Sequence, residues 1–205
     1  MQILIASNNP HKSEEIAAIL SGFPGIDILT LRDLAAPPPE PVEDGATLEE
    51  NAYIKAREVY DATGMPTLAD DTGLEVDALG GEPGVHSARY AGAAATYADN
   101  CAKLLGELGS RDSAERRARF RTVMCFVDGD RTLFAEGMVE GSIIASPRGD
   151  GGFGYDPLFV PDGETRTFAE MPASEKHAIS HRGRALAHLR EVIAPYLTEA
   201  SAING

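Results

Sequence analysis

Residues 47–73 read TLEENAYIKAREVYDATGMPTLADDTG, and this stretch decides the kind of fold that the sequence predicts. The spacing Thr47-x-x-Glu50 is that of a capping box, which opens a helix that we expect to end near Thr63. A short strand, 67–69, follows after a proline and leads directly into the paired carboxylates Asp70-Asp71. A helix followed at once by a strand indicates an α/β protein.

The rest of the chain alternates less regularly between the two kinds of element. Hydrophobic spacing predicts helices between Pro10 and Gly22, at 96–108 and at 175–197, and strands at 3–6, 26–29, 120–127, 132–145 and 158–160. The proline run 37–41 forbids regular structure. Because a strict strand-helix-strand order is missing, we expect an α/β sheet that is partly antiparallel. The length of 205 residues fits one large domain, or one domain with a smaller lobe.

Composition excludes several classes of function. Hydrophobic residues make up 43% of the chain and charged residues 24%, as in a globular protein with a real core. The formal charge of −14 repels polyanions, so we expect no binding of nucleic acid. The N-terminal segment is unlike a signal peptide, and no apolar run approaches a membrane span of about 20 residues. Cys101 and Cys125 form no metal-ligand pattern, so we expect a cytoplasmic protein without a membrane partner.

The carboxylate pair Asp70-Asp71 is the strongest chemical signal. Neighbouring side chains of a strand point to opposite faces, so one aspartate is expected to face a cleft and the other to bond to backbone or solvent. Together with Glu43, the facing aspartate has the oxygen ligands that Mg²⁺ prefers. The alternative is a polar loop with capping aspartates, and the lysines described next favour the metal.

Two lysines are placed to neutralise phosphate. Ser7-Asn-Asn-Pro-His-Lys12 lies where a strand passes into a helix, and a helix N-terminus attracts anions, although an ordinary capped helix with a solvated Lys12 fits equally well. Lys55 falls on the apolar stripe of its helix beside Asn51. We therefore expect Lys55 to point inward, against the alternative that it snorkels to water.

A glycine-rich run and a later cationic segment suggest a site for a base. Gly149-Asp-Gly-Gly-Phe-Gly-Tyr-Asp156 permits close approach to a ligand, and Phe153 offers a ring for stacking, whereas Tyr155 fits a core position better. Lys176 and Arg182 are hydrogen-bond donors that favour a purine with a carbonyl oxygen at position 6. They are six residues apart, so both reach one ligand only if the helix is broken between them.

In order along nearly the whole chain, six motifs closely resemble the inosine triphosphate pyrophosphatase family. They are Ser7 to Lys12, Glu50-Asn-Ala-x-x-Lys55, Leu68-Ala-Asp-Asp-Thr-Gly-Leu74, Pro83-Gly-Val-His-Ser-Ala-Arg-Tyr-Ala-Gly92, Gly151-Gly-Phe-Gly-Tyr-Asp-Pro157 and Ser180-His-Arg-Gly183. The chain has Ser7, Asn8 and Thr72 where threonine, glycine and serine are common in the family. These changes affect the fine geometry of the phosphate loop.

The resemblance implies a single nucleotide pyrophosphatase domain over 1–205, with an elongated mixed sheet flanked by helices and two lobes around a central cleft. It implies a Mg²⁺-dependent homodimer that hydrolyses ITP, dITP and XTP to a monophosphate and pyrophosphate. Asp71 resembles the general base and, with Glu43, the metal ligands. The implied substrate residues are Ser7, Asn8, Asn9, Pro10, His11, Lys12, Lys55, Thr72, Phe153, Gly154, Tyr155, Asp156, Lys176, His181 and Arg182.

Two alternative hypotheses about the function remain. A pyrophosphatase of the septum-inhibitor-like group would prefer modified pyrimidine nucleotides, and Ser180-His-Arg-Gly183 speaks against it. A nucleotide-binding sensor without catalysis would keep the lysines and the glycine-rich run but would not need the Asp70-Asp71 pair beside Glu43.

Overall fold

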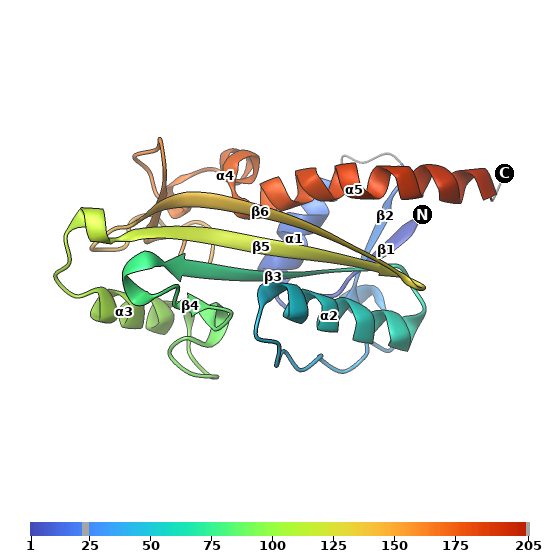
Figure 1. Cartoon of the computed structure of the whole chain (residues 1–205), viewed down its shortest axis with the longest axis horizontal. Helices are drawn as coiled ribbons and strands as arrows, with labels where there is room; N and C mark the ends of the chain where they lie inside the picture. Colours follow the sequence, from blue (N-terminus) through green and yellow to red (C-terminus); the bar gives the residue numbers. More distant parts are fainter. Residues whose placement is uncertain (22–24, 204–205) are drawn as a thin grey trace. The chain divides into compact units, whose positions relative to one another are not determined.

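The computed structural model describes residues 1–21 and 25–203, which divide into two compact units. Unit 1 comprises Met1–Asp71, Thr122–Gly137 and Arg182–Gly205, and unit 2 comprises Thr72–Arg121 and Met138–His181. The α-helices are α1 (Pro10–Leu20), α2 (Leu48–Thr63), α3 (Tyr97–Leu108), α4 (Ala173–Ile179) and α5 (His181–Ile203). The strands are β1 (Gln2–Ile5), β2 (Asp27–Thr30), β3 (Thr67–Val76), β4 (Pro83–Gly84), β5 (Arg117–Asp128), β6 (Arg131–Ile143) and β7 (Phe159–Pro161) (Figure 1).

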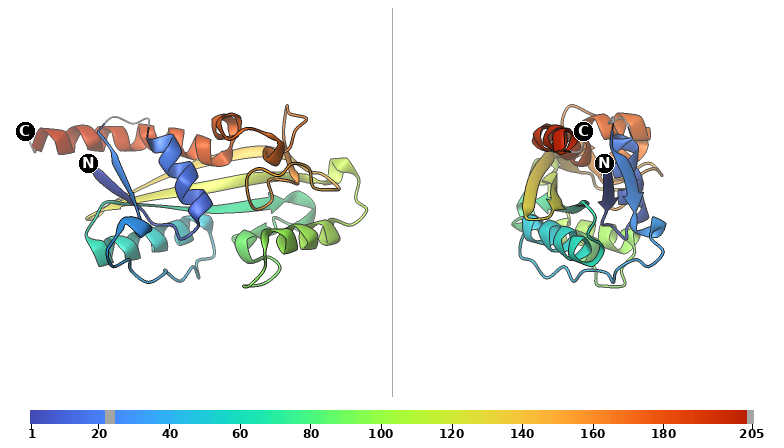
Figure 2. Two further views of the ribbon diagram at one scale, coloured as in Figure 1. Left: turned by 180° about the vertical axis from the view of Figure 1, so that it is seen from behind. Right: turned by 90° about the vertical axis from the view of Figure 1, so that its right-hand side faces the viewer.

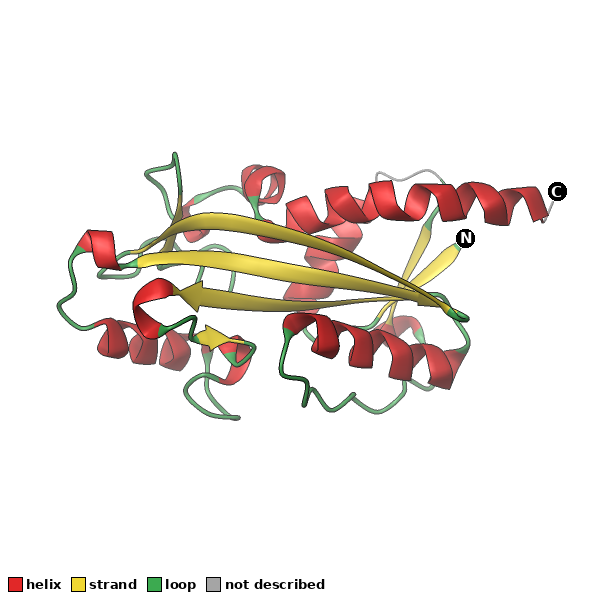
Figure 3. Cartoon of the chain, in the orientation of Figure 1, coloured by secondary structure: helices red, strands yellow, loops and turns green. Residues whose placement is uncertain are grey.

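The strands form one mixed sheet in the order β2-β1-β3-β5-β6-β7, with β4 paired to β3. β1 runs parallel to both β2 and β3, whereas β4 and β7 pair antiparallel with β3 and β6. The predicted fold class, an α/β sheet that is partly antiparallel and flanked by helices, is therefore confirmed (Figure 3). β5 and β6 are neighbours joined at Gly129, whose φ of +62° suits glycine.

The core of unit 1 packs α1 and α5 against one face of its strands. Ile3 and Ile5 of β1 and Leu68 of β3 share one apolar cluster with Ile16 of α1 and Leu186 of α5. α2 lies on the other side of β1 and β3 (Figure 2). Residues at odd and even positions of β3 therefore face different helices.

Unit 2 has its own core, built on α3 and the far ends of the long strands. Leu104 and Leu108 of α3 pack in one cluster with Ala118 and Phe120 of β5. The intervening strand positions point the other way. There Arg119 pairs with Glu75 of β3, Glu140 of β6 and Asp77, which directly follows β3. This alternation gives unit 2 one apolar and one charged sheet face.

Two predicted boundaries were wrong, and one predicted capping motif is only half formed. β3 does not end at Ala69 but continues to Val76, so the carboxylates lie inside a strand. The helix expected over 175–197 is broken at Ser180, whose ψ of 159° is extended, and α5 then runs on to Ile203. The capping box at Thr47 is half formed, since Thr47 accepts from the Glu50 amide but the Glu50 carboxylate accepts from Ala46 instead.

Among the described residues, no helix has both the length and the apolar character needed to cross a bilayer.

Candidate active site

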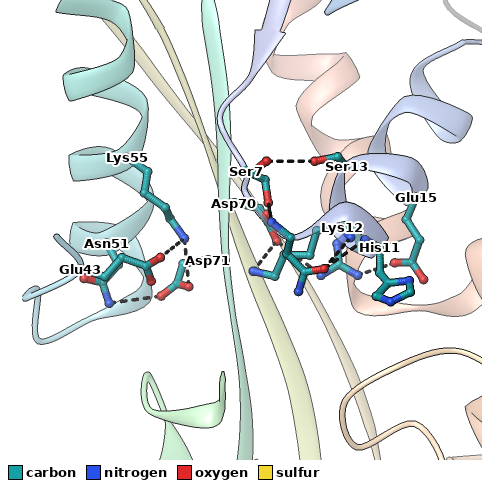
Figure 4. A network of polar contacts seen from close by, with 12 residues as sticks. Ser7, His11, Lys12, Ser13, Glu15, Glu43, Asn51, Lys55, Asp70 and Asp71 are labelled. Atoms are coloured by element: carbon teal, nitrogen blue, oxygen red, sulfur yellow. Dashed lines mark hydrogen bonds and ion pairs between the residues drawn. The ribbon is translucent and has the colours of Figure 1, made fainter. Parts of the chain in front are cut away.

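The two carboxylates of β3 lie on different faces of the strand. Asp70 shares the face of Leu68 and so points toward α1 and α5, while Asp71 points toward α2. Their exposed fractions are 1% and 6%. The expectation that one aspartate would bond to backbone or solvent was wrong, because each of them binds cationic side chains (Figure 4).

Asp70 is held between two cations. Its Oδ2 atom lies 3.2 Å from Nζ of Lys12 and 3.4 Å from Nη2 of Arg182. The guanidinium of Arg182, itself 1% exposed, also donates to Glu15 of α1. This chain of ion pairs joins α1, β3 and α5 within unit 1, and it fixes the direction of the Lys12 side chain.

Asp71 lies in a second group of polar side chains on the α2 side. Nζ of Lys55 is 3.3 Å from Oδ1 of Asp71 and 3.3 Å from Oε1 of Glu43. Nδ2 of Asn51 donates to Oδ2 of Asp71 at 3.2 Å, and its Oδ1 accepts from the Gly45 amide at 2.9 Å. The predicted inward direction of Lys55, with 8% of its surface exposed, is confirmed.

Gly45 is required at its position in this group. A Cβ atom there would come within 2.7 Å of Oδ1 of Asn51, closer than real Cβ contacts. The glycine thus lets the loop that carries Glu43 approach α2, so that its amide can hold the asparagine.

The environments separate the pKa values of the two aspartates. Burial is the largest influence on both and raises the pKa of a carboxyl group. For Asp71 burial prevails over the nearby lysines, and its pKa is raised. For Asp70 the charges of Lys12, Arg182 and Lys55 together prevail, and its pKa is lowered. Opposed shifts of the pKa values of two neighbouring carboxyl groups are common in acid–base sites.

The lysines are likewise unequal. Burial, the largest influence on each, lowers the pKa of an ammonium group. Lys55 has its pKa raised because Asp71 and Asp70 outweigh burial. The pKa of Lys12 is lowered, since the charges of Lys55 and Arg182 add to burial and Asp70 does not compensate. An anion bound beside Lys12 would relieve this repulsion between cations.

The start of α1 is well capped. The Asn9 side chain accepts from the amides of His11 and Lys12 at 3.0 and 3.4 Å, and the Asn9 amide donates to Oγ of Ser7 at 3.3 Å. Pro10, the first helical residue, has no N–H to satisfy. The alternative hypothesis for this segment was an ordinary capped helix with a solvated Lys12. The cap is present, but Lys12 is not solvated in the way that this hypothesis predicts, because it binds Asp70. Asn8 is exposed and Thr72 half-buried.

Glu43 and Asp71 share one cationic partner, the ammonium of Lys55. Their oxygens converge on the ammonium of Lys55 at the same distance of 3.3 Å, so a positive charge already lies between them. No group of three or more acidic, histidine or cysteine side chains suited to a metal occurs in the described part of the chain. Two carboxylates with the remaining ligands from phosphate and water are typical of Mg²⁺.

A second buried ion pair lies in unit 2. Nζ of Lys176 is 2.7 Å from Oδ2 of Asp156, and both side chains are 4% exposed. The same ammonium lies 4.9 Å from the centre of the Phe153 ring, within reach of a cation–π contact. Phe153 is held in turn by its amide, which donates to Oδ2 of Asp156 at 2.8 Å. A Cβ atom at Gly152 would lie 2.1 Å from this oxygen, so only glycine fits.

Unit 2 also contains the predicted residues Gly154, Tyr155 and His181. The Tyr155 hydroxyl donates to the Ser87 carbonyl at 2.9 Å and is buried, which confirms the core position favoured from the sequence. Gly154 adopts a φ of +62°. The His181 ring stacks on Phe120 at 4.6 Å with an interplanar angle of 17°.

The break that was predicted between Lys176 and Arg182 occurs at Ser180, whose backbone is extended. Lys176 and His181 belong to unit 2, whereas Arg182 belongs to unit 1, where Asp70 and Glu15 bind it. Sequence reasoning foresaw the need for a break but missed the partners of Arg182. The only signal for Glu15 is its place three residues after Lys12, on the same side of α1.

The fold and these groups define an α/β protein in which two adjacent aspartates of one strand each bind the ammonium group of a lysine. A sequence model of the Ham1 family matches residues 3–192. The chain therefore belongs to the Ham1 family, which confirms the resemblance to inosine triphosphate pyrophosphatases.

Individual relatives match this chain over nearly their full length. A Geobacter sulfurreducens protein named dITP/XTP pyrophosphatase is 50% identical over 192 residues, which are 93% of this chain and 95% of that one. The structure of a HAM1 protein from Coxiella burnetii matches with a TM-score of 0.83 and 40% identity, covering 97% and 99% of the two chains. A structure named nucleoside-triphosphatase and dITP/XTP pyrophosphatase, from Mycobacterium abscessus, matches with a TM-score of 0.73 and 46% identity over 92% and 97%.

Proposed function

We propose that this protein is a nucleoside triphosphate pyrophosphohydrolase that converts ITP, dITP and XTP to the monophosphate and pyrophosphate. The observation that carries the proposal is the convergence of Glu43 and Asp71 on Lys55. The charge of Lys12 also acts on Asp71, where it opposes the rise in pKa that burial causes. The names of relatives at 46–50% identity support the same reaction. Both units would serve one domain over 1–205, with phosphate chemistry in unit 1 and base recognition by residues of unit 2 together with Arg182 of unit 1.

Glu43 and Asp71 are the residues that we propose to hold Mg²⁺. When bound, the ion polarises the phosphate oxygens and neutralises part of the charge that develops during phosphoryl transfer. Both donors are carboxylates, which suits this ion better than zinc or copper.

Asp71 is the proposed general base. Its carboxylate takes a proton from a water whose oxygen attacks the α-phosphorus, and the bond from that phosphorus to the bridging oxygen breaks as pyrophosphate leaves. The raised pKa makes Asp71 a stronger base than an ordinary aspartate. Asn51 orients the carboxylate by donating to one oxygen and leaves the other to Lys55.

Lys12 and Lys55 are the proposed partners of the phosphate chain, with the loop Ser7 to Pro10 and His11 around it. Charge stabilisation of this kind is a large part of phosphoryl-transfer catalysis. Asp70 keeps its negative charge, because its pKa is lowered, and so holds Lys12 in place before substrate arrives.

Base recognition is assigned to Phe153, Gly154, Tyr155, Asp156, Lys176, His181 and Arg182, with Thr72 beside the catalytic aspartate. The Lys176 ammonium can donate to a carbonyl oxygen at position 6 of a purine but cannot accept from an amino group, which disfavours adenine. Arg182 stays in the proposed set, and its contacts with Asp70 and Glu15 fix its orientation.

The test is a product assay with ITP, XTP, ATP and UTP at fixed concentration, with MgCl₂ or with EDTA. We expect Mg²⁺-dependent formation of monophosphate and pyrophosphate from ITP and XTP, with much slower turnover of ATP and UTP. Phosphate should be released only after inorganic pyrophosphatase is added, which separates this reaction from removal of the terminal phosphate. Binding of ITP without pyrophosphate release would instead identify a sensor, and a preference for pyrimidine nucleotides would identify the septum-inhibitor-like alternative.

We also propose a homodimer in the cytoplasm. Gel filtration with light scattering should give twice the monomer mass, and a monomer at micromolar concentration would contradict the proposal. The two buried, unpaired cysteines are compatible with a reducing compartment.

A further inference from the structure

An exposed tyrosine borders the aromatic side chain proposed for base stacking. Tyr97 is the first residue of α3 and is 40% exposed. Its ring centre lies 6.0 Å from that of Phe153, and the two rings are tilted by 41°. Both residues belong to unit 2.

The backbone that carries Tyr97 is fixed. Thr96 caps α3, with its hydroxyl accepting from the Asp99 amide at 3.2 Å, and the Asp99 carboxylate accepts from the Thr96 amide at 2.8 Å. This reciprocal capping box determines where the helix begins. The ring of Tyr97 is thus attached to a rigid position, and a large apolar surface on it remains open to solvent.

Phe153 by itself is a small platform. Its single six-membered ring is narrower than the fused rings of a purine, and the Lys176 ammonium already lies 4.9 Å from its centre. Stacking on an aromatic ring contributes about 1–3 kcal/mol per base and does not depend strongly on which base it is. A second ring beside the first, tilted by 41°, would contact the edge of the purine that extends beyond Phe153.

We propose that Tyr97 is a substrate-contacting residue whose ring, tilted by 41° from that of Phe153, contacts the edge of a purine that stacks on Phe153. This inference rests on the proposed function and adds a residue to its base site. The contact is made by the ring and not by the hydroxyl, so it strengthens binding of purine nucleotides without selecting among them. Selection stays with Lys176.

Kinetics of Mg²⁺-dependent ITP hydrolysis test the proposal with Tyr97→Ala and Tyr97→Phe. We expect Tyr97→Ala to raise KM for ITP about fivefold with kcat within twofold of the parent, and Tyr97→Phe to behave like the parent. The ratio of kcat/KM for ITP to that for ATP should not change. Tyr53→Ala is the matched control, because Tyr53 is also 40% exposed and lies on α2 in unit 1.

A tyrosine that only supports Phe153 in packing would give a different result. Tyr97→Ala would then lower the melting temperature while leaving KM unchanged, and this outcome overturns the proposal. An equal change of KM in Tyr53→Ala would overturn it as well, since the effect would not be local.

Fluorescence gives a second readout that does not depend on turnover. The chain contains no tryptophan, so Tyr97→Trp introduces a single indole at the proposed surface. Titration with IMP should change its emission with saturation, whereas the emission of Tyr53→Trp should stay constant. A silent Tyr97→Trp in an enzyme that still hydrolyses ITP would refute the contact with the purine alone. Absence of ITP hydrolysis by the parent protein would refute the proposed function, and IMP titration would still decide the role of Tyr97.

Discussion

The same substitution at two adjacent residues, Asp70→Asn and Asp71→Asn, should have opposite consequences. Asp70 is 1% exposed and faces Lys12 and Arg182, so its neutralisation leaves two cations without their shared anion. Breaking a buried ion pair by removing one partner costs about 3–5 kcal/mol. In a chain of this length that corresponds to a fall in melting temperature of roughly 6–20 °C.

Asp71→Asn should leave stability nearly unchanged and remove activity. Burial already disfavours the charged form of Asp71, as its raised pKa shows, and Lys55 keeps Glu43 as a partner 3.3 Å away. We expect the free energy of unfolding to fall by less than about 1.5 kcal/mol, which is within the usual range for a single substitution. Removal of the base should reduce kcat for ITP by at least about a hundredfold.

The assay combines urea unfolding followed by circular dichroism with pyrophosphate release under identical buffer conditions. The slope of the unfolding free energy against urea concentration should be the same for the parent and both variants, so that differences in the urea midpoint report differences in stability. The reasoning fails if Asp70→Asn is as stable as the parent, or if Asp71→Asn is destabilised as much as Asp70→Asn. Near-normal turnover by a folded Asp71→Asn variant would remove Asp71 from the role of base.

Three further predictions concern the same groups. Lys176→Ala should reduce the preference for ITP over ATP about tenfold, measured as the ratio of kcat/KM values; an unchanged ratio would contradict the role of Lys176. The pH range in which kcat/KM is high should be narrower than an aspartate and a lysine with ordinary pKa values would give. The acid limb follows the raised pKa of Asp71 and lies above pH 3.8, and the alkaline limb follows the lowered pKa of Lys12 and lies below pH 10.5. Glu15→Gln should destabilise the protein by about 1–3 kcal/mol because Arg182 is buried, while its exposed neighbour Glu14→Gln should change stability by less than about 0.5 kcal/mol.

Local rules predicted the elements of this fold more accurately than their ends. Helix α2 and its inward Lys55 followed from hydrophobic spacing, because each depends on residues within a few turns. The end of β3 was misjudged, since Asp70 and Asp71 are poor strand formers by propensity. Their partners Lys12, Lys55 and Arg182 stabilise them inside the sheet, and this tertiary effect is absent from the local sequence.

The sequence indicated which residues are candidates for the site, but not which of them contact one another. Motif resemblance gave Lys12, Asp71 and Lys176 without contacts. Nothing local indicates that Arg182 binds Glu15, because the two are 167 positions apart. The stacking of His181 on Phe120 likewise depends on the break at Ser180, which turns one predicted helix into two.

The route of the backbone has a consequence for how such a protein can be cut or recombined. Five consecutive stretches belong alternately to the two units, with changes of unit after Asp71, Arg121, Gly137 and His181. Neither unit corresponds to a continuous piece of a gene, so exchange of terminal fragments cannot transplant the phosphate chemistry onto another base-binding module. If the proposed function holds, new base preferences would arise instead from point changes in unit 2 around Lys176 and its partner Asp156.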